Sequence, residues 1–195
     1  RPRRPPQRGN PRHINGELLP RQDAKISVFD SGYLVGDGVW EGLRLHHGVL
    51  VFLDPRLNCH SKLHEVQALI QALQAGADEA LMLDIHGFVT ICNATNFFMV
   101  KNDQVWTSTG QYCMNGITSS KVLAACQQQD IPCAEKNFSL FDVYGADEAF
   151  VTGTFGVTPV TAVDGREIGP YGPMTRQLQA HYDELVQQAT AEQRR

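Results

Sequence analysis

Lys62 is the side chain in this sequence that is best placed for covalent chemistry. It stands at the start of a predicted helix, on the same side as an apolar stripe, so its amine can point into the protein. An amine held among apolar groups loses its proton more readily than one in water, and the neutral amine is the form that bonds to an aldehyde cofactor. The ordinary alternative is a lysine whose charged end reaches the surface.

Two junctions of the chain could hold an anion. Gly116-Ile117-Thr118 opens a predicted helix, and Gly153-Thr154 follows a predicted strand. The start of a helix presents unbonded N–H groups and the positive end of the helix dipole, and both attract anions. For each junction taken alone, a plain helix cap or turn is the alternative.

His60 and His64 are spaced to share one helix face, with Cys59 nearby. Some zinc sites use this spacing, but no third ligand stands at a suitable distance, so we predict no metal site. The cysteines form no CxxC pair, and we predict that they are buried free thiols. They are Cys59, Cys92, Cys113, Cys126 and Cys133.

The elements that must position these residues are helices and strands, mixed along the sequence without strict alternation. Apolar residues at three- and four-residue spacings predict a helix over 63–75 that ends at Gly76. Further helices are expected from Thr118 to about Gln129, from Ser139 to Gly145 and from Pro173 onward. Strands are expected within 26–53, with a hairpin turn at His47-Gly48, and over 79–84, 88–92, 96–101, 105–108, 148–152 and 158–163. The mixture predicts an α+β fold.

Charge and hydropathy exclude several classes of protein. Five arginines and no acid occur in residues 1–12, which leaves 12 basic against 21 acidic residues and a net charge of about −9 for the remainder. So acidic a body argues against a nucleic-acid groove. No apolar run is long enough for a membrane span and no secretory signal precedes the body, so we expect an intracellular protein.

The run from Asp30 to Arg44, DSGYLVGDGVWEGLR, resembles the opening of class IV aminotransferases. That family contains branched-chain and D-amino-acid aminotransferases and aminodeoxychorismate lyase. The resemblance resumes from Asn58 to about Thr175 with the family's order and spacing. The matching segments are 60–63, 75–81, 93–98, 116–118, 145–150 and 152–154.

The resemblance implies a role for each matching residue. Lys62 matches the lysine that binds pyridoxal 5′-phosphate as a Schiff base and then moves the substrate's Cα proton. Ile117, Thr118 and Thr154 match positions whose backbone and hydroxyl groups hold the cofactor phosphate, and Gly116 and Gly153 belong to the same two motifs. Trp40 matches an aromatic residue of the substrate pocket, and a core tryptophan is the alternative.

The chain departs from the family at three places. Between Asp54 and Asn58 the family carries a long segment, with an arginine that reaches the phosphate, and that segment is absent here. Ile91 stands where many relatives have a glutamate that pairs with the pyridinium nitrogen, so Thr90, Thr95 or water would have to replace it. Ser119 stands where an arginine commonly follows Gly-Ile-Thr.

The resemblance therefore implies the α+β fold of the class IV aminotransferases, like that of D-amino-acid aminotransferase, with a truncated small domain. We expect a disordered Arg/Pro-rich head over 1–12, the small-domain remnant over 13–54, the large cofactor domain over 55–188 and a frayed tail over 189–195. The implied activity is amino-group transfer between an amino acid, branched-chain by overall resemblance, and a 2-oxo acid, impaired by the missing segment. The implied setting is a cytoplasmic homodimer. A non-catalytic binding or dimerising module and an aminodeoxychorismate-lyase-like enzyme are the alternatives.

Overall fold

The computed structural model describes residues 12–14, 17–20, 22–25, 27, 39–40, 44–47, 49–51, 58–59 and 62–192. Two compact units divide the chain. One takes Arg1–Val39 and Cys59–Ser61, and the other takes Trp40–Asn58 and Lys62–Arg195. Helices and strands are mixed in the second unit, which confirms the α+β prediction.

The centre of the second unit is a five-stranded sheet in the order β11-β10-β9-β12-β13. Four of its strands are antiparallel neighbours, and β11 runs parallel to β10. A parallel pair requires a crossover, and helix α3 supplies it. The strands are β9 (Asn96–Lys101), β10 (Gln104–Thr107), β11 (Cys133–Glu135), β12 (Glu148–Gly153) and β13 (Gly156–Val160).

Strand β9 is buried on both faces because its apolar side chains alternate between two cores. Phe98 and Val100 join one hydrophobic cluster, and Phe97 and Met99 join the other. This alternation is the two-residue period of a strand with a layer on each side. The sequence therefore places β9 at the middle of the sheet.

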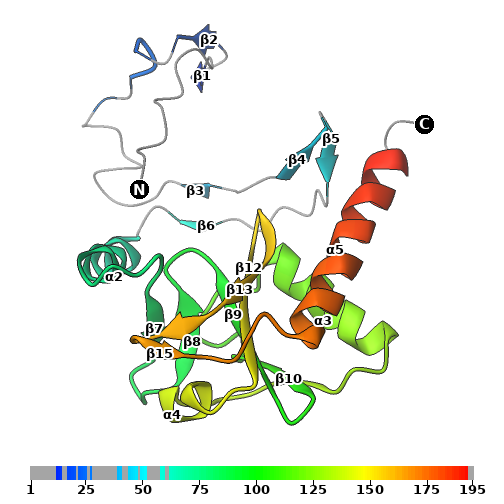
Figure 1. The fold of residues 1–195 in the computed structure, drawn as a ribbon. Helices are drawn as coiled ribbons and strands as arrows, with labels where there is room; N and C mark the ends of the chain where they lie inside the picture. The colour runs from blue at the N-terminus through cyan, green and yellow to red at the C-terminus, as the bar shows by residue number, and fades with distance from the viewer. Residues whose placement is uncertain are drawn as a thin grey trace. The chain divides into compact units, whose positions relative to one another are not determined.

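Helices α3 (Ile117–Gln128) and α5 (Pro173–Glu192) lie on one side of the sheet (Figure 1). Leu178, Tyr182 and Val186 of α5 share one helix face and are buried in that core. The second core includes the short helix α4 (Leu140–Tyr144) together with parts of β7 (Leu81–Leu83) and β8 (Val89–Cys92). Strands β14 (Ala162–Val163) and β15 (Arg166–Glu167) form a small hairpin.

Turn chemistry in the sequence marks several boundaries correctly. Strands β4 (Arg44–His46) and β5 (Val49–Val51) pair antiparallel around His47, whose φ is 48°. Asn102 and Asp103 have φ values of 50° and 57° between β9 and β10, and Asn and Asp tolerate this left-handed region. Much of the region 26–53, in which strands are predicted, lies outside the described residues, including all of 28–38.

Some elements differ from the sequence expectations. The hairpin of β1 (Arg12–Ile14) and β2 (Glu17–Leu19) and strand β11 were not predicted, since three-residue strands leave little periodicity. Two-residue strands β3 (Val39–Trp40) and β6 (Asn58–Cys59) pair with each other. Helix α5 continues past residue 188, and Thr190 is buried.

Helix α2 (Leu63–Gln74) confirms the predicted helix, and Gly76 follows it with φ of 80°. Its apolar stripe lies at the surface of the described part of the chain, and Ala72 is the buried residue of this helix. The sequence analysis uses this stripe to predict that Lys62 points into the protein. Because the stripe is exposed, it gives no support to that orientation. The exposed fractions are 69% for Leu63, 49% for Val66, 49% for Ile70 and 59% for Leu73.

No helix among the described residues has the length and apolar content that a membrane crossing requires.

Candidate functional site

Helix α3 begins after Gly116, which has no side chain to cap the first backbone N–H groups of the helix. Its first residue follows Gly116, whose φ of −64° and ψ of 150° are extended, and its first turn contains no acid. A helix normally satisfies its first N–H groups with a cap, water or a ligand. The start of α3 therefore has the donors and the positive dipole end that an anion needs.

Gly116 has a close neighbour. A Cβ atom there would collide with the side-chain oxygen of Asn96, which would have to move. The amide nitrogen of Asn96 donates to the Met114 carbonyl at 2.7 Å, which fixes the loop that leads into α3. Asn96, at the start of β9, is thus a supporting residue that the sequence analysis did not assign.

The second predicted junction is the turn between β12 and β13. Gly153 pairs with Gly156, so Thr154 and Phe155 form the two-residue turn. Gly156 has φ of 107°, which favours glycine. A Cβ on Gly153 would lie 3.1 Å from the Phe155 ring and 3.2 Å from the Thr95 methyl group, so this turn is closely packed.

The structure joins the two junctions directly. The Thr118 hydroxyl donates to the Gly153 carbonyl at 2.7 Å, across 35 residues of sequence. The Thr118 oxygen also lies 3.2 Å from the hydroxyl of Tyr182 in α5. Two motifs that are far apart in the sequence are therefore in direct contact in the fold.

Lys62 is at the N-cap of α2, where the sequence predicts it. Its Nζ atom lies 2.6 Å from a carboxylate oxygen of Glu65, and the two side chains are 23% and 17% exposed. The direction of the amine relative to the α3 and β12–β13 junctions stays a prediction. Glu65 was not assigned, although its spacing of three residues on a helix is typical of an ion pair.

Other assigned residues lie near or beyond the edge of the described chain. Trp40 belongs to β3, and its side chain is outside the described residues. His60 is also outside the described residues, and His64 is exposed. Among the residues that are described, no group of three His, Cys, Asp or Glu side chains could hold a metal ion.

Ile91 is half-buried in β8 and offers no polar atom to a ring nitrogen. The two hydroxyls proposed to replace a glutamate both donate to other groups. Thr90 donates to the Met82 carbonyl at 3.1 Å, and Thr95 donates to a Glu79 carboxylate oxygen at 2.5 Å. Glu79 is therefore an acid beside Thr95 that the sequence analysis did not assign.

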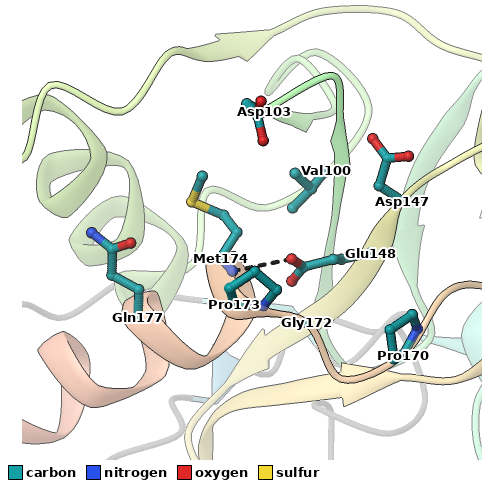
Figure 2. A pocket seen from close by; sticks show the side chains of 9 residues that line it. All are labelled: Val100, Asp103, Asp147, Glu148, Pro170, Gly172, Pro173, Met174 and Gln177. Atoms are coloured by element: carbon teal, nitrogen blue, oxygen red, sulfur yellow. Dashed lines mark hydrogen bonds between the residues drawn. The ribbon is translucent and has the colours of Figure 1, made fainter.

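A cavity of about 340 Å³ opens at the start of α5 (Figure 2). Buried Glu148 accepts hydrogen bonds from the Met174 N–H at 3.0 Å and the Thr175 N–H at 2.8 Å. Asp147 accepts one from the Asn102 N–H at 2.8 Å. These acids satisfy backbone donors, and none of the residues that we assign to the candidate site lines this cavity.

The described residues fit the phosphate end of pyridoxal phosphate better than its ring end. The uncapped start of α3 and the adjacent Gly153-Thr154 turn offer donors from two sides. The buried Thr152 hydroxyl, next to Gly153, has no hydrogen-bond partner among the described residues, which also fits a group absent from the chain. At the ring end, Ile91 offers nothing to a pyridinium nitrogen.

Comparison with known proteins returns branched-chain aminotransferases, D-alanine aminotransferases and 4-amino-4-deoxychorismate lyases. The family model described as amino-transferase class IV matches residues 38–163. Branched-chain-amino-acid aminotransferase-like protein 2 of Arabidopsis thaliana is 41% identical over 137 residues, 69% of this chain and 24% of that protein. The branched-chain amino acid aminotransferase of T.th., solved with pyridoxamine 5′-phosphate, has a TM-score of 0.62 and 32% identity, and the match covers 65% of this chain and 43% of that one.

The chain spans less than half of the first curated relatives that it matches. A branched-chain-aminotransferase relative from Methanocaldococcus jannaschii is 27% identical over 274 residues, 89% of this chain and 95% of that protein. This alignment is longer than the 195 residues of the chain. The relative therefore contains residues without a counterpart here, in agreement with a missing internal segment.

Proposed function

The chain belongs to the class IV aminotransferase family, and on that premise we propose that it binds pyridoxal 5′-phosphate and transfers an amino group between an amino acid and a 2-oxo acid. The observation that carries the proposal is the hydrogen bond from Thr118 to Gly153. It holds together the two motifs to which the family resemblance assigns the phosphate. A sequence match alone would not require these motifs to meet.

Each assigned residue has a distinct task in this proposal. The backbone N–H groups of Ile117 and Thr118 bind the phosphate at the start of α3, and Thr154 binds it from the β12–β13 turn. When bound, the cofactor supplies an electron sink for the carbanion at the substrate Cα. Lys62 anchors the cofactor. Its amine takes the proton from the substrate Cα and gives it back in a later step of the amino transfer.

Branched-chain amino acids are the proposed substrates, because the relatives reported above are named for them. Trp40 is the proposed aromatic residue of the substrate pocket. We further propose a homodimer in the cytoplasm. These finer assignments rest on resemblance, since the chain spans only part of those relatives.

The proposed activity is weak. Ile91 cannot pair with the ring nitrogen, and the resemblance places a phosphate-binding arginine in the segment that is absent between Asp54 and Asn58. A cofactor held by fewer groups is mobile, and a displacement of about 1 Å can lower a rate on the order of a hundredfold. We therefore expect cofactor binding to survive better than turnover.

Borohydride reduction of the protein with pyridoxal phosphate tests Lys62. We expect a covalent adduct on the peptide that contains Lys62, and we expect Lys62→Ala to abolish it because this amine is the proposed partner of the aldehyde. Peptide mass spectrometry locates the adduct. Lys121→Ala, which alters a lysine later in α3, is the matched control and should leave the adduct in place.

Turnover of leucine with 2-oxoglutarate completes the test. We expect a measurable rate far below that of a full-length relative, and none in Lys62→Ala. An adduct on another lysine contradicts the assignment of Lys62. Brisk turnover shows that the missing segment matters less than we propose.

A second candidate is a non-catalytic module that keeps the fold and binds a partner. The exposed apolar stripe of α2 favours it, because exposed apolar helices commonly mark an interaction surface. A colourless protein without adduct after incubation with pyridoxal phosphate would support this candidate. Pyruvate release from aminodeoxychorismate would instead identify the lyase reaction.

A further inference from the structure

Tyr182 lies far along the last helix and in no motif of the family resemblance, yet its hydroxyl contacts the candidate phosphate site. The side chain is 2% exposed, and its oxygen is 3.2 Å from the Thr118 oxygen. Thr118 is 5% exposed. The contact is therefore shielded from solvent. A hydrogen bond in the protein interior is stronger than one in water.

The direction of the hydrogen bonds follows from the number of protons. A threonine hydroxyl has one proton, and Thr118 donates it to the Gly153 carbonyl at 2.7 Å. Tyr182 must then be the donor in its contact with Thr118. The three groups form a one-way chain from the Tyr182 hydroxyl through the Thr118 hydroxyl to the Gly153 carbonyl.

In this series of hydrogen bonds the Thr118 hydroxyl is fully engaged, and the Thr118 backbone N–H at the start of α3 remains for an anion. The series also connects three elements, since Tyr182 belongs to α5, Thr118 to α3 and Gly153 to β12. An anion that is bound between α3 and the β12–β13 turn requires both sides at a fixed spacing. Groups that are held in place before binding lose less entropy when the ligand arrives.

We propose that Tyr182 is a positioning residue for phosphate binding, and that it acts through Thr118 without touching the ligand. The inference rests on the proposed function, because it concerns the same site. It adds a residue that lies outside the matching motifs, and it explains why a polar hydroxyl is kept in the core beside α3.

Tyr182→Phe tests the contact with Thr118, because it removes the hydroxyl and keeps the ring in the core. The affinities for pyridoxal 5′-phosphate and for pyridoxal, which lacks the phosphate, are measured by absorbance titration of the full chain. We expect the variant to bind pyridoxal 5′-phosphate roughly threefold to tenfold more weakly, the size expected for one hydrogen bond. Pyridoxal should bind to the variant and to the wild type within about twofold.

Two further variants separate positioning from a general structural effect. Thr118→Val breaks the same series of hydrogen bonds and should give the same loss of affinity for pyridoxal 5′-phosphate. Thr118→Ser keeps the hydroxyl and should retain the wild-type affinity. Tyr144→Phe is the matched control, because it removes a tyrosine hydroxyl that donates to Asp164 at 2.7 Å elsewhere in the fold. It should change neither affinity.

Each outcome decides the inference. An equal loss for both ligands in Tyr182→Phe would make Tyr182 merely structural and overturn the proposal. Wild-type affinity in that variant would also overturn it and leave the proposed function intact. If the wild-type chain binds neither pyridoxal 5′-phosphate nor inorganic phosphate, the inference and the proposed function both fail.

Discussion

Two cysteine thiols illustrate how surroundings set reactivity at the scale of single residues. Cys92 and Cys126 are 4% and 0% exposed, and burial raises the pKa of each thiol from 9.0 to about 12. Nearby Glu79 raises the pKa of Cys92 further, and Cys133 does so for Cys126. The thiolate is the reactive form, so these two residues are inert at neutral pH.

Alkylation of the native protein tests this assignment. With iodoacetamide at pH 8, we expect half-buried Cys113 and Cys133 to be labelled and Cys92 and Cys126 to stay unlabelled. Peptide mass spectrometry gives the labelled positions. Labelling of Cys126 as fast as Cys113 would show that its core opens readily.

The same pKa shifts predict a loss of stability in alkali. In the folded state the two thiols keep their protons up to about pH 12, whereas in the unfolded state they lose them near pH 9.0. The free energy of unfolding should therefore decrease as the pH rises from 9 to 12, with no contribution from these groups below that window. Cys126→Ala should reduce this slope, which urea unfolding at several pH values measures.

At the scale of elements, α5 is held at its first turn by a residue from β12. Glu148 is 6% exposed, and its two carboxylate oxygens each accept a hydrogen bond from a backbone N–H. One N–H belongs to Met174, as Figure 2 shows, and the other to Thr175. Gly172 is needed beside it, because a Cβ there would collide with the Glu148 carboxyl group. The helix that carries Tyr182 thus depends on an acid from the central sheet.

Glu148→Ala should destabilise the protein by about 1–3 kcal/mol, since it leaves two helix N–H groups without their acceptor. Chemical denaturation measures the change. Exposed Glu167 of β15 provides the control, because Glu167→Ala should change stability by less than about 0.5 kcal/mol. Equal effects of the two substitutions would contradict the capping role.

At the scale of the whole molecule, the chain combines a closed core with an uncovered helix. The sheet, α3 and α5 share one hydrophobic cluster that also contains Val51 of β5. The apolar stripe of α2 is at the surface of the described chain, in a protein that lacks residues present in a longer relative. An exposed apolar stripe promotes association and lowers solubility.

Substitutions in the stripe should improve solubility at little cost in stability. Ile70→Gln with Leu73→Gln should lower the fluorescence of a bound hydrophobic dye and reduce light scattering. The free energy of unfolding should change by less than about 1 kcal/mol for the pair, because both side chains are about half exposed. Leu178→Ala in the core should cost about 2–5 kcal/mol. A comparable cost for the α2 pair would show that the stripe is covered.

Local patterns in the sequence were enough to predict most elements around the site. Apolar spacing predicts α2 and α5, and turn residues such as His47 and Asn102 mark the hairpins, because these signals act over a few neighbouring residues. The motif resemblance also brought Lys62, Gly116 to Thr118 and Gly153 into one hypothesis. Strand β11 could not be predicted, since its pairing with β10 depends on residues far away in the chain.

Only the tertiary structure decided which of these residues meet. The hydrogen bond from Thr118 to Gly153 and the contact of Tyr182 with Thr118 join three elements, and no local pattern encodes a distance of that kind. The same holds for the stripe of α2, because periodicity shows which side of a helix is apolar but not whether another element covers it. Whether an apolar face is buried depends on what packs against it, which only the folded chain determines.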